Sequence, residues 1–449
     1  MSTPRDDTTS YTRSDLESLV GQVLQEARSQ GATQAEAGIS IESGLNLSVR
    51  MGDVETLEYQ RDRGLGITVY FGQRKGSAST SDLSSAAITE TVRAAASIAR
   101  YTAEDDCAGL ADAALMAKHP ADLDLCHPWA LEPDTAIELA QECEAAAREF
   151  DPRITNSEGA SVSSHRGLRV YGNSHGFVGG YESTSHSLSC SVIGSEGDSM
   201  QRDYWYSTAR DASELESAQT VGRRAAERTV ARLGARKLGT RKAPVLFVPE
   251  MARGFLGHFL GAIRGGAQYR QASFLLGGMG QQVFPEFVQL SERPHLRGAL
   301  ASAAFDNEGV ATRDREIVDA GVASTYLLDS YSARKLGLQT TGHAGGIRNL
   351  IVRPGELDYA GLLKQMDTGL VVAELIGQGV NGVTGDYSRG AAGFWVEHGE
   401  IVYPVEEITI AGNLREMYRN VIAVGSDVDV RGGIRTGSIL IGEMTIAGE

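Results

Sequence analysis

Strand-like segments come in blocks in this chain and do not alternate regularly with helices. Two runs alternate apolar with polar residues, with apolar positions at Leu45, Leu47, Val49 and Met51, and then at Ile67, Val69 and Phe71. A second strand series is predicted over residues 161–207, and many short, glycine-rich strands follow residue 243. Strands in blocks favour antiparallel sheets with helices packed beside them. The predicted fold class is therefore α+β, with an N-terminal antiparallel or mixed sheet and packed helices, followed by a β-rich C-terminal domain.

Helices and turns are predicted at defined positions between these strands. Ser14 and Glu17 form a predicted capping box for a first amphipathic helix that ends at Gly31. Further helices are predicted over residues 83–101, 134–150, 213–233, 251–263 and 413–420, the last with Asn413 as its N-cap. Turns are predicted at Gly44, Gly52 and Gly64, which makes the first strands consecutive antiparallel neighbours.

The basic string ARKLGTRKAP, residues 235–244, is predicted to be a linker. It separates an N-terminal α+β domain, residues 1–234, from a β-rich C-terminal domain, residues 245–449. A chain of 449 residues is long enough to divide in this way.

Charge and composition exclude several classes of protein. The chain carries 58 acidic against 42 basic residues, a formal net charge of −16, which disfavours nucleic acid as a direct ligand. The polar N-terminus has no apolar core, and no run approaches the roughly 20 apolar residues of a membrane span. The four cysteines are too widely spaced for a paired-cysteine zinc motif. We expect a cytoplasmic protein that does not enter a membrane.

The segment VLFVPEMARGFLGHF, residues 245–259, contains a carboxylate and a single imidazole. A helical zinc site needs two neutral imidazoles on one face and a carboxylate that deprotonates the metal-bound water. Glu250 could serve as that carboxylate, but Pro249 precedes it and His258 is the only histidine nearby. The nine histidines never occur as a pair at i, i+3 or i, i+4. The residues therefore predict no catalytic group and no metal ligand set, while a zinc site built from distant segments stays open.

Two motif outlines are rejected because of their context. Gly377, Gly379 and Gly382 spell GxGxxG, but a dinucleotide site needs a helix at the last glycine, and this chain continues into a strand. The GxSxG outline over residues 172–176 lies between two strands, which favours a hairpin turn over a nucleophile elbow.

Polar, glycine-spaced segments at residues 341–349 and 377–400 are candidates for binding. Glycine lets backbones approach closely, which suits capture of an extended peptide or contact between subunits, while tight turns between core strands are an equal alternative. The predicted cleft or interface residues are Asn381, Asp386, Tyr387, Ser388 and Arg389. Arg389 is expected to be exposed and to hold a carboxylate. A side chain at Gly382 or Gly385 is expected to meet a neighbouring strand or to require a positive φ.

Long strings of the sequence resemble the TldD/PmbA family of peptidases, also called peptidase U62. They include RDRGLGITVYFGQRKGSAST, SYSARKLGLQTTGHAGG and GVNGVTGDYSRGAAGFWVE. The resemblance implies that active members carry HExxxH where this chain reads PEMARG, so that Pro249 and Gly254 stand in place of the two imidazoles. It also implies a C-terminal cysteine ligand, whereas this chain has no cysteine after Cys190. These differences match the PmbA (TldE) branch, which lacks the zinc motif.

The resemblance implies a non-catalytic subunit of a heteromeric TldD/TldE zinc metallopeptidase that cleaves unfolded peptides and matures peptide precursors. Zinc is then expected only in the active, TldD-like partner subunit, and this chain alone is expected to be inactive and to form a homodimer through its C-terminal domain. Two alternatives are a stand-alone hydrolase with an unrecognised site and a binding protein that modulates another target such as DNA gyrase.

Overall fold

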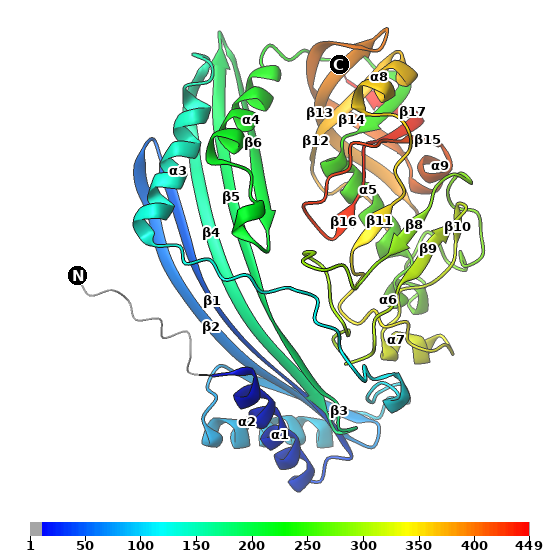
Figure 1. The fold of residues 1–449 in the computed structure, drawn as a ribbon. Coiled ribbons are helices and arrows are strands. Elements are labelled where there is room, and N and C mark those ends of the chain that lie inside the picture. Colours follow the sequence, from blue (N-terminus) through cyan, green and yellow to red (C-terminus); the bar gives the residue numbers. More distant parts are fainter. Residues whose placement is uncertain (1–10, 449) are drawn as a thin grey trace.

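The computed structural model describes residues 11–448 and has an N-terminal part built on one sheet and a C-terminal part built on two (Figure 1). The N-terminal helices are α1 (Arg13–Ser29), α2 (Ser85–Tyr101), α3 (Pro133–Arg148) and α4 (Ala218–Ala231). The N-terminal strands are β1 (Gln34–Arg50), β2 (Asp53–Phe71), β3 (Arg74–Thr80), β4 (Ile154–Asn173), β5 (Val178–Glu196) and β6 (Ser199–Ala209). Short 3₁₀ helices lie at η1 (Ala113–Leu115) and η2 (Ala212–Glu214).

The N-terminal sheet is antiparallel throughout, in the order β3-β2-β1-β4-β5-β6. Of the predicted turns, only Gly52 lies in one, at the β1–β2 hairpin. Gly44 and Gly64 lie inside the strands and pair with Gln60 and Ser40. A glycine is required at position 44 because a Cβ there would lie 2.3 Å from Nδ1 of His165 on β4.

All four N-terminal helices cover one face of this sheet. The buried residues of β1 are all odd-numbered, and side chains two apart on a strand share a face. Ala35, Ala37 and Ile39 pack with α1 and α2, whereas Leu45, Leu47 and Val49 pack with α3 and α4. The predicted alternation of this strand is confirmed, except that Met51 lies exposed in the turn.

The start of α1 differs from its prediction. Its capping box consists of Thr12 and Asp15, and the side chains exchange hydrogen bonds with each other's backbone N–H. Glu17 instead pairs with Arg13, with 2.7 Å between Oε1 and Nε. The sequence contains two overlapping capping pairs here, and the upstream pair adds two residues, Arg13 and Ser14, to the helix.

The C-terminal part contains five helices among the described residues, α5 (Pro249–Ala262), α6 (Gly265–Tyr269), α7 (Ser330–Lys335), α8 (Tyr359–Met366) and α9 (Leu414–Arg419). Its strands are β7 (Arg241–Phe247), β8 (Leu290–Glu292), β9 (Arg315–Asp319), β10 (Val322–Ala323), β11 (Leu350–Val352), β12 (Gly369–Ile376), β13 (Asp386–Glu397), β14 (Glu400–Asn413), β15 (Val421–Val424), β16 (Ile434–Arg435) and β17 (Ile439–Ala447). The α+β class with a β-rich C-terminal region is therefore confirmed. The cap at Asn413 is also confirmed, because its side chain accepts from the Arg415 amide.

Three of these C-terminal helices escaped the sequence prediction. They are α6, α7 and α8, with five, six and eight residues. Such short helices show too few turns for a 3.6-residue period to stand out. Asp358 caps α8 by accepting from the Gly361 amide, and this is the local signal that marks that helix.

The C-terminal core lies in a barrel. Strands β14-β13-β12-β7-β17 are neighbours in that order, and β14 also pairs with β17, which closes the ring. Helix α5 packs on it through an aromatic cluster in which Phe255, Phe259 and Phe284 surround the fully buried ring of Tyr418.

Strand β7 begins inside the predicted linker. The prediction is wrong for residues 241–244, because they belong to β7, and residues 241–243 pair with β17 in the barrel. The basic side chains suggested a solvated linker, but Arg241 and Lys242 are exposed strand positions, and Ala243 next to them is buried. The division of the chain near this point stays a proposal.

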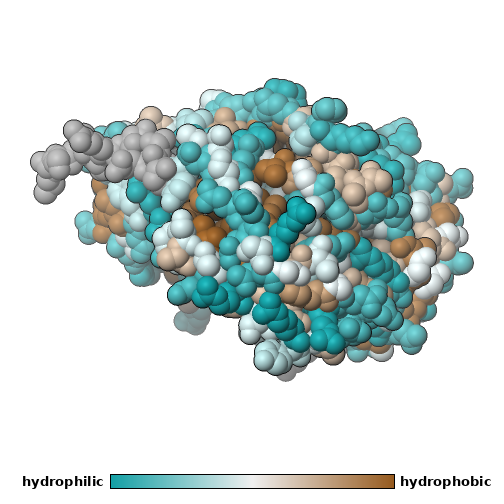
Figure 2. Space-filling view, turned by 90° about the horizontal axis from the view of Figure 1, so that it is seen from below, coloured by the Kyte–Doolittle hydropathy of each residue, from teal (hydrophilic) through white to brown (hydrophobic). Residues whose placement is uncertain are grey.

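Figure 2 shows hydrophilic residues predominating on the face that it presents, with hydrophobic residues in separate groups. Between residues 11 and 448, no helix combines the length and apolar character that a membrane crossing requires.

Candidate functional site

The predicted degenerate motif lies at the N-terminus of α5, where this helix meets the N-terminal part. Pro249 is the first helical residue, a position that suits its fixed φ and missing N–H. Glu250 follows within the first turn, and its side chain is largely buried, with 16% exposed. Gly254 lies one turn further along, with no atom within 4 Å of the place of a Cβ.

Glu250 is held by two guanidinium groups. Its Oε1 lies 3.3 Å from Nη1 of Arg228 on α4 and 3.4 Å from Nη2 of Arg431. A zinc site at this helix would need imidazoles beside the carboxylate, and two cations next to it oppose a third. In residues 11–448 no group of three or more His, Cys, Asp or Glu side chains is placed to hold a metal ion. The residues at this position do not fit zinc.

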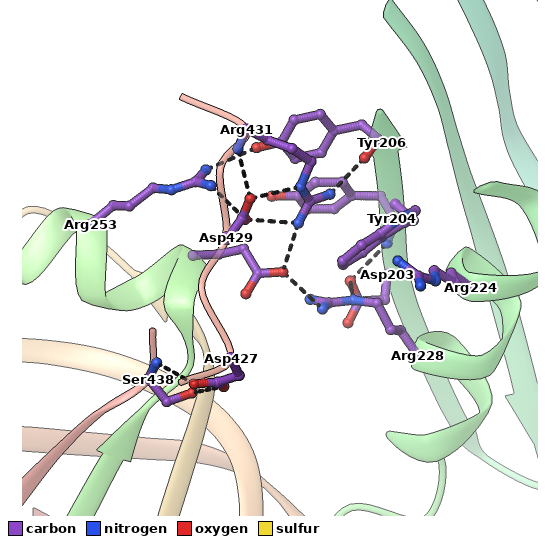
Figure 3. Close-up of polar contacts among 12 residues, drawn as sticks. Asp203, Tyr204, Tyr206, Arg224, Arg228, Arg253, Asp427, Asp429, Arg431 and Ser438 are labelled. Carbon is purple, nitrogen blue, oxygen red and sulfur yellow. Dashed lines mark hydrogen bonds and ion pairs between the residues drawn. The ribbon is translucent and has the colours of Figure 1, made fainter. Parts of the chain in front are cut away.

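Arg431 belongs to a dense arrangement of charges and rings that we call the Trp205 cluster (Figure 3). Its members are Asp203, Trp205, Tyr206, Arg228, Arg232, Glu250, Arg253, Asp429 and Arg431. They come from β6, from α4 and its C-cap Arg232, from α5 and from the loop before β16, so the cluster joins the N-terminal part to the C-terminal part.

Arg431 makes the largest number of contacts in the Trp205 cluster. Its guanidinium carbon lies 3.8 Å from the Trp205 ring centre and 4.4 Å from that of Tyr206. Its Nη1 donates to the Tyr206 carbonyl at 2.6 Å, and its Nε and Nη2 donate to Asp429 at 3.1 Å and 2.9 Å. The planar guanidinium thus stacks on the two rings and donates two hydrogen bonds to the Asp429 carboxylate at the same time, which a lysine could not do.

The charges of the Trp205 cluster shift the pKa of Asp429. Burial opposes ionisation of this carboxyl, but hydrogen bonds from Arg431 and the charges of Arg253 and Arg431 outweigh it, so the pKa of Asp429 is lowered. Arg253 contributes a further contact by donating from Nη1 to the Tyr206 hydroxyl at 3.1 Å. The ion pairs of Glu250 with Arg228 and Arg431 tie the two parts together.

A pocket of about 770 Å³ opens beside the Trp205 cluster, between α4 and the N-terminus of α5. Its described lining consists of Asp203, Trp205, Glu216, Arg224, Glu227, Arg228, Ala231, Val248, Pro249, Glu250, Tyr359, Val371, Ala373, Phe394, Asp427, Val428, Asp429, Val430 and Arg431. This described lining includes no histidine, cysteine, serine, threonine or lysine. It offers aromatic faces and both signs of charge, which suit binding of a polar chain, but no serine, threonine, cysteine or lysine nucleophile and no histidine base.

The five residues nominated from sequence divide between two sides of β13. Asn381, Asp386 and Ser388 line a shallow pocket of about 530 Å³ formed by the loop after β12. Asn381 shapes that loop, since its side chain accepts from the amides of Val383 and Thr384. Hydrogen bonds from Thr384 and Asn413 lower the pKa of Asp386.

Tyr387 and Arg389 point to the other side of β13, towards α5. The Tyr387 ring is buried and lies 6.1 Å, edge to face, from His258, and burial raises the pKa of Tyr387 to about 12. Burial and then the charge of Arg389 lower the pKa of His258. Arg389 is half-buried and donates to the Leu375 carbonyl at 3.4 Å, so the expectation of an exposed guanidinium is wrong. The sequence did not show which side of β13 each residue faces.

Gly379 has no space for a side chain, whereas Gly382 has. A Cβ at Gly379 would lie 1.9 Å from the Ser388 carbonyl oxygen, whereas nothing lies within 4 Å of one at Gly382. The prediction for Gly382 is therefore wrong, while Gly385 has the expected positive φ of 85°. The rejected dinucleotide motif is confirmed as a strand–loop–strand segment, with no helix after Gly382.

We expect Gly379→Ala to destabilise the protein by roughly 1–3 kcal/mol, since the loop must leave β13 to avoid the clash. Gly382→Ala is the matched control in the same loop, with an expected change below about 0.5 kcal/mol. Urea unfolding of both variants, with hydrogen exchange at the Ser388 amide that donates to Gly379, measures the difference. Equal effects of the two substitutions would contradict this account.

The segment 341–349 is a buried structural network. The imidazole of His343 lies 2.8 Å from the Thr341 hydroxyl through Nδ1 and 2.8 Å from Glu292 through Nε2. This order resembles a hydrolase triad, but the side chains of His343 and Glu292 are 1% and 4% exposed. The Thr341 hydroxyl also accepts from the Leu328 amide. The interpretation as tight turns between core strands fits this segment.

Sequence reasoning missed Arg431, Asp429 and Trp205. The signal in the sequence is the alternation DVDVRGG over residues 427–433, which reads by itself as a solvated turn. Likewise, the GxSxG outline proves to be the β4–β5 hairpin, as predicted.

Three family models match the chain in consecutive segments. They are described as PmbA/TldA metallopeptidase domain 1, central domain and C-terminal domain, and they match residues 35–99, 126–233 and 240–448. Metalloprotease PmbA of Escherichia coli O157:H7 is 53% identical over 97% of both chains. A PmbA homolog of Haemophilus influenzae is 51% identical over 97% of this chain and 96% of its own length.

Solved structures share the whole fold. A protein of Bacteroides thetaiotaomicron superposes with a TM-score of 0.91 at 29% identity, covering 96% of this chain and 99% of its own. TldE of Thermococcus kodakarensis superposes with a TM-score of 0.81, covering 96% of this chain and 100% of its own, but at 18% identity the likeness concerns the fold alone.

Proposed function

Because the chain belongs to the PmbA/TldD metallopeptidase family, on its PmbA branch, we propose that it is the non-catalytic, TldE-like subunit of a heteromeric zinc metallopeptidase. The observation that carries this proposal is the state of Glu250. The carboxylate that would activate a metal-bound water is instead the shared partner of Arg228 and Arg431, on a helix with Pro249 and Gly254 at the places of imidazoles.

The proposed partner is a family member that carries HExxxH, and the proposed substrates are unfolded peptides, including precursors that mature by cleavage. Zinc, when bound in that partner, supplies the activated water. The pocket beside the Trp205 cluster supports a role for this chain in holding peptide, since aromatic faces and guanidinium groups bind an extended chain and its carboxylates.

A stand-alone hydrolase is less well supported. The described lining of the pocket beside the motif helix has no serine, threonine, cysteine or lysine nucleophile and no histidine, and the side chains of His343 and Glu292 are buried. The Bacteroides thetaiotaomicron protein is described as a putative modulator of DNA gyrase, but the net charge of −16 in this chain does not favour direct binding to DNA.

Metal analysis and mixing test the proposal. The purified chain should hold less than about 0.1 zinc per chain, whereas the HExxxH-bearing chain from the same organism should hold about one. Sedimentation of a mixture of the two should show a complex that neither chain forms alone. About one tightly held zinc in this chain, or no complex at tens of micromolar, would contradict the proposed role.

The glycine content of the C-terminal domain predicts that domain as the surface for self-association. Its barrel is closed by the β14–β17 pairing, so these strands offer less free edge than the sequence suggests. We therefore place self-association elsewhere, on an edge of the N-terminal sheet.

A further inference from the structure

Strand β2 has a long free edge. It pairs with β1 along its whole length, but β3 pairs only with residues 65–71 of its other side. No described strand pairs with that side over residues 53–63, and all eleven of these residues are exposed. A free edge of this length presents unpaired N–H and C=O groups and is a template for another strand.

The opposite edge of the same sheet is protected. On β6, the Tyr206 carbonyl accepts from Arg431 and the Arg202 carbonyl accepts from Arg232. In Figure 1, β6 lies on the side of the sheet that faces the C-terminal part. The free segment DVETLEYQRDR contains neither proline nor lysine, the residues that commonly prevent edge pairing. The β6 edge is thus covered by other parts of the chain, whereas the β2 edge over residues 53–63 is open to another strand.

Two exposed apolar side chains continue the core as far as the free edge. Leu57 and Tyr59 are 44% and 60% exposed. They pair with Leu47 and Leu45 on β1, and residues that pair across strands share a face. Leu45 and Leu47 lie in the core under α3 and α4, so Leu57 and Tyr59 continue that core outward to the sheet edge.

The side chains along this edge are complementary to those of a second copy when the two segments pair antiparallel. When the segment pairs antiparallel with a second copy about Glu58, Glu55 lies opposite Arg61 and Leu57 lies opposite Tyr59, while a bulge in β2 at Glu55 takes Asp53 out of this register. Each pair occurs twice by the two-fold symmetry, and Leu57 and Tyr59 lie on the core face. The one unfavourable pair, Glu58 with its own copy, lies on the other face.

We propose that two copies of this chain join edge to edge through residues 53–63 of β2, in this antiparallel register, to form one continuous sheet. The occupant of the free edge is a second copy because Glu55 near one end of the segment meets Arg61 near the other when the segment pairs with itself in reverse. A two-fold axis passes between the two Glu58 residues.

Charge reversal and mixing test this interface in the full-length chain. Glu55→Arg and Arg61→Glu, each alone, create two like-charge pairs and should raise the dissociation constant at least about tenfold. Mixed together, the two variants place Arg against Glu at both positions and should restore a dimer. Lys242→Glu and Glu443→Arg make the same charge changes at an exposed pair on β7 and β17 and should associate like the parent.

Sedimentation equilibrium at tens of micromolar decides between the outcomes. A dimeric parent, weakened single variants and a restored mixture support the proposal. A monomeric parent, single variants as dimeric as the parent, or a mixture no better than its components would overturn it. Circular dichroism confirms that each variant is folded.

A cross-link tests the register independently. Directly opposite residues of an antiparallel pair have Cα atoms about 4.5–5.5 Å apart, within reach of a disulfide. Glu58→Cys should therefore give a covalent dimer on mild oxidation, above the background of the parent with its four native cysteines. No covalent dimer from this variant would overturn the proposed register.

Discussion

Arg431→Ala should lower the midpoint of thermal unfolding by roughly 5 °C or more, which corresponds to a loss of roughly 3 kcal/mol from the contact between the two parts. The guanidinium is 11% exposed, and its removal deprives Asp429 and Glu250, which are 8% and 16% exposed, of a charge partner. The loss should stay near the lower end for a buried ion pair, because Asp429 keeps Arg253 and Glu250 keeps Arg228.

Arg224→Ala is the matched control for this prediction. Its guanidinium also lies over Trp205, at 5.1 Å, but the side chain is 49% exposed and pairs with Glu216 at the surface. An exposed pair of this kind contributes at most about 1 kcal/mol. The unfolding midpoint of Arg431→Lys should lie between those of Arg431→Ala and Arg224→Ala. Lysine keeps the charge, but it cannot stack on the rings and donate two parallel hydrogen bonds at the same time. Equal midpoints for Arg431→Ala and Arg224→Ala would show that the Trp205 cluster does not hold the two parts together.

Local periodicity predicted most long elements of the N-terminal part. The spacing of apolar residues in β1 marked its buried face, and the helices expected over 83–101 and 134–150 appear as α2 and α3. Errors arose where one local rule competes with another. Gly44 and Gly64 suggested turns, yet a long strand accommodates them, and at Gly44 the neighbouring His165 occupies the space of a side chain.

The candidate site could be predicted only in part. The absence of imidazoles at Pro249 and Gly254 is visible in the sequence, but the ion pairs that Glu250 forms are not. Its partners Arg228 and Arg431 lie 22 and 181 residues away, and no local pattern connects segments so distant. The nominated residues of β13 illustrate the same limit, because the burial of Tyr387 and Arg389 depends on α5, which packs against them.

The central claim is that catalysis resides in the partner subunit, and the motif glutamates of the two chains distinguish the alternatives. In the partner, the glutamate of HExxxH is expected to act as general base, so its change to glutamine should lower cleavage at least about a hundredfold. In this chain, Glu250→Gln should leave cleavage by the assembled complex within about twofold, because Glu250 balances two arginines and has no metal-bound water to deprotonate.

The decisive measurement is the rate of cleavage of an unstructured peptide by four mixtures, in which each chain carries either its glutamate or glutamine, expressed per folded complex. The account predicts that the rate follows the partner's glutamate alone and that this chain by itself cleaves nothing. A loss of a hundredfold or more from Glu250→Gln with the partner intact, or cleavage by this chain alone, would contradict it.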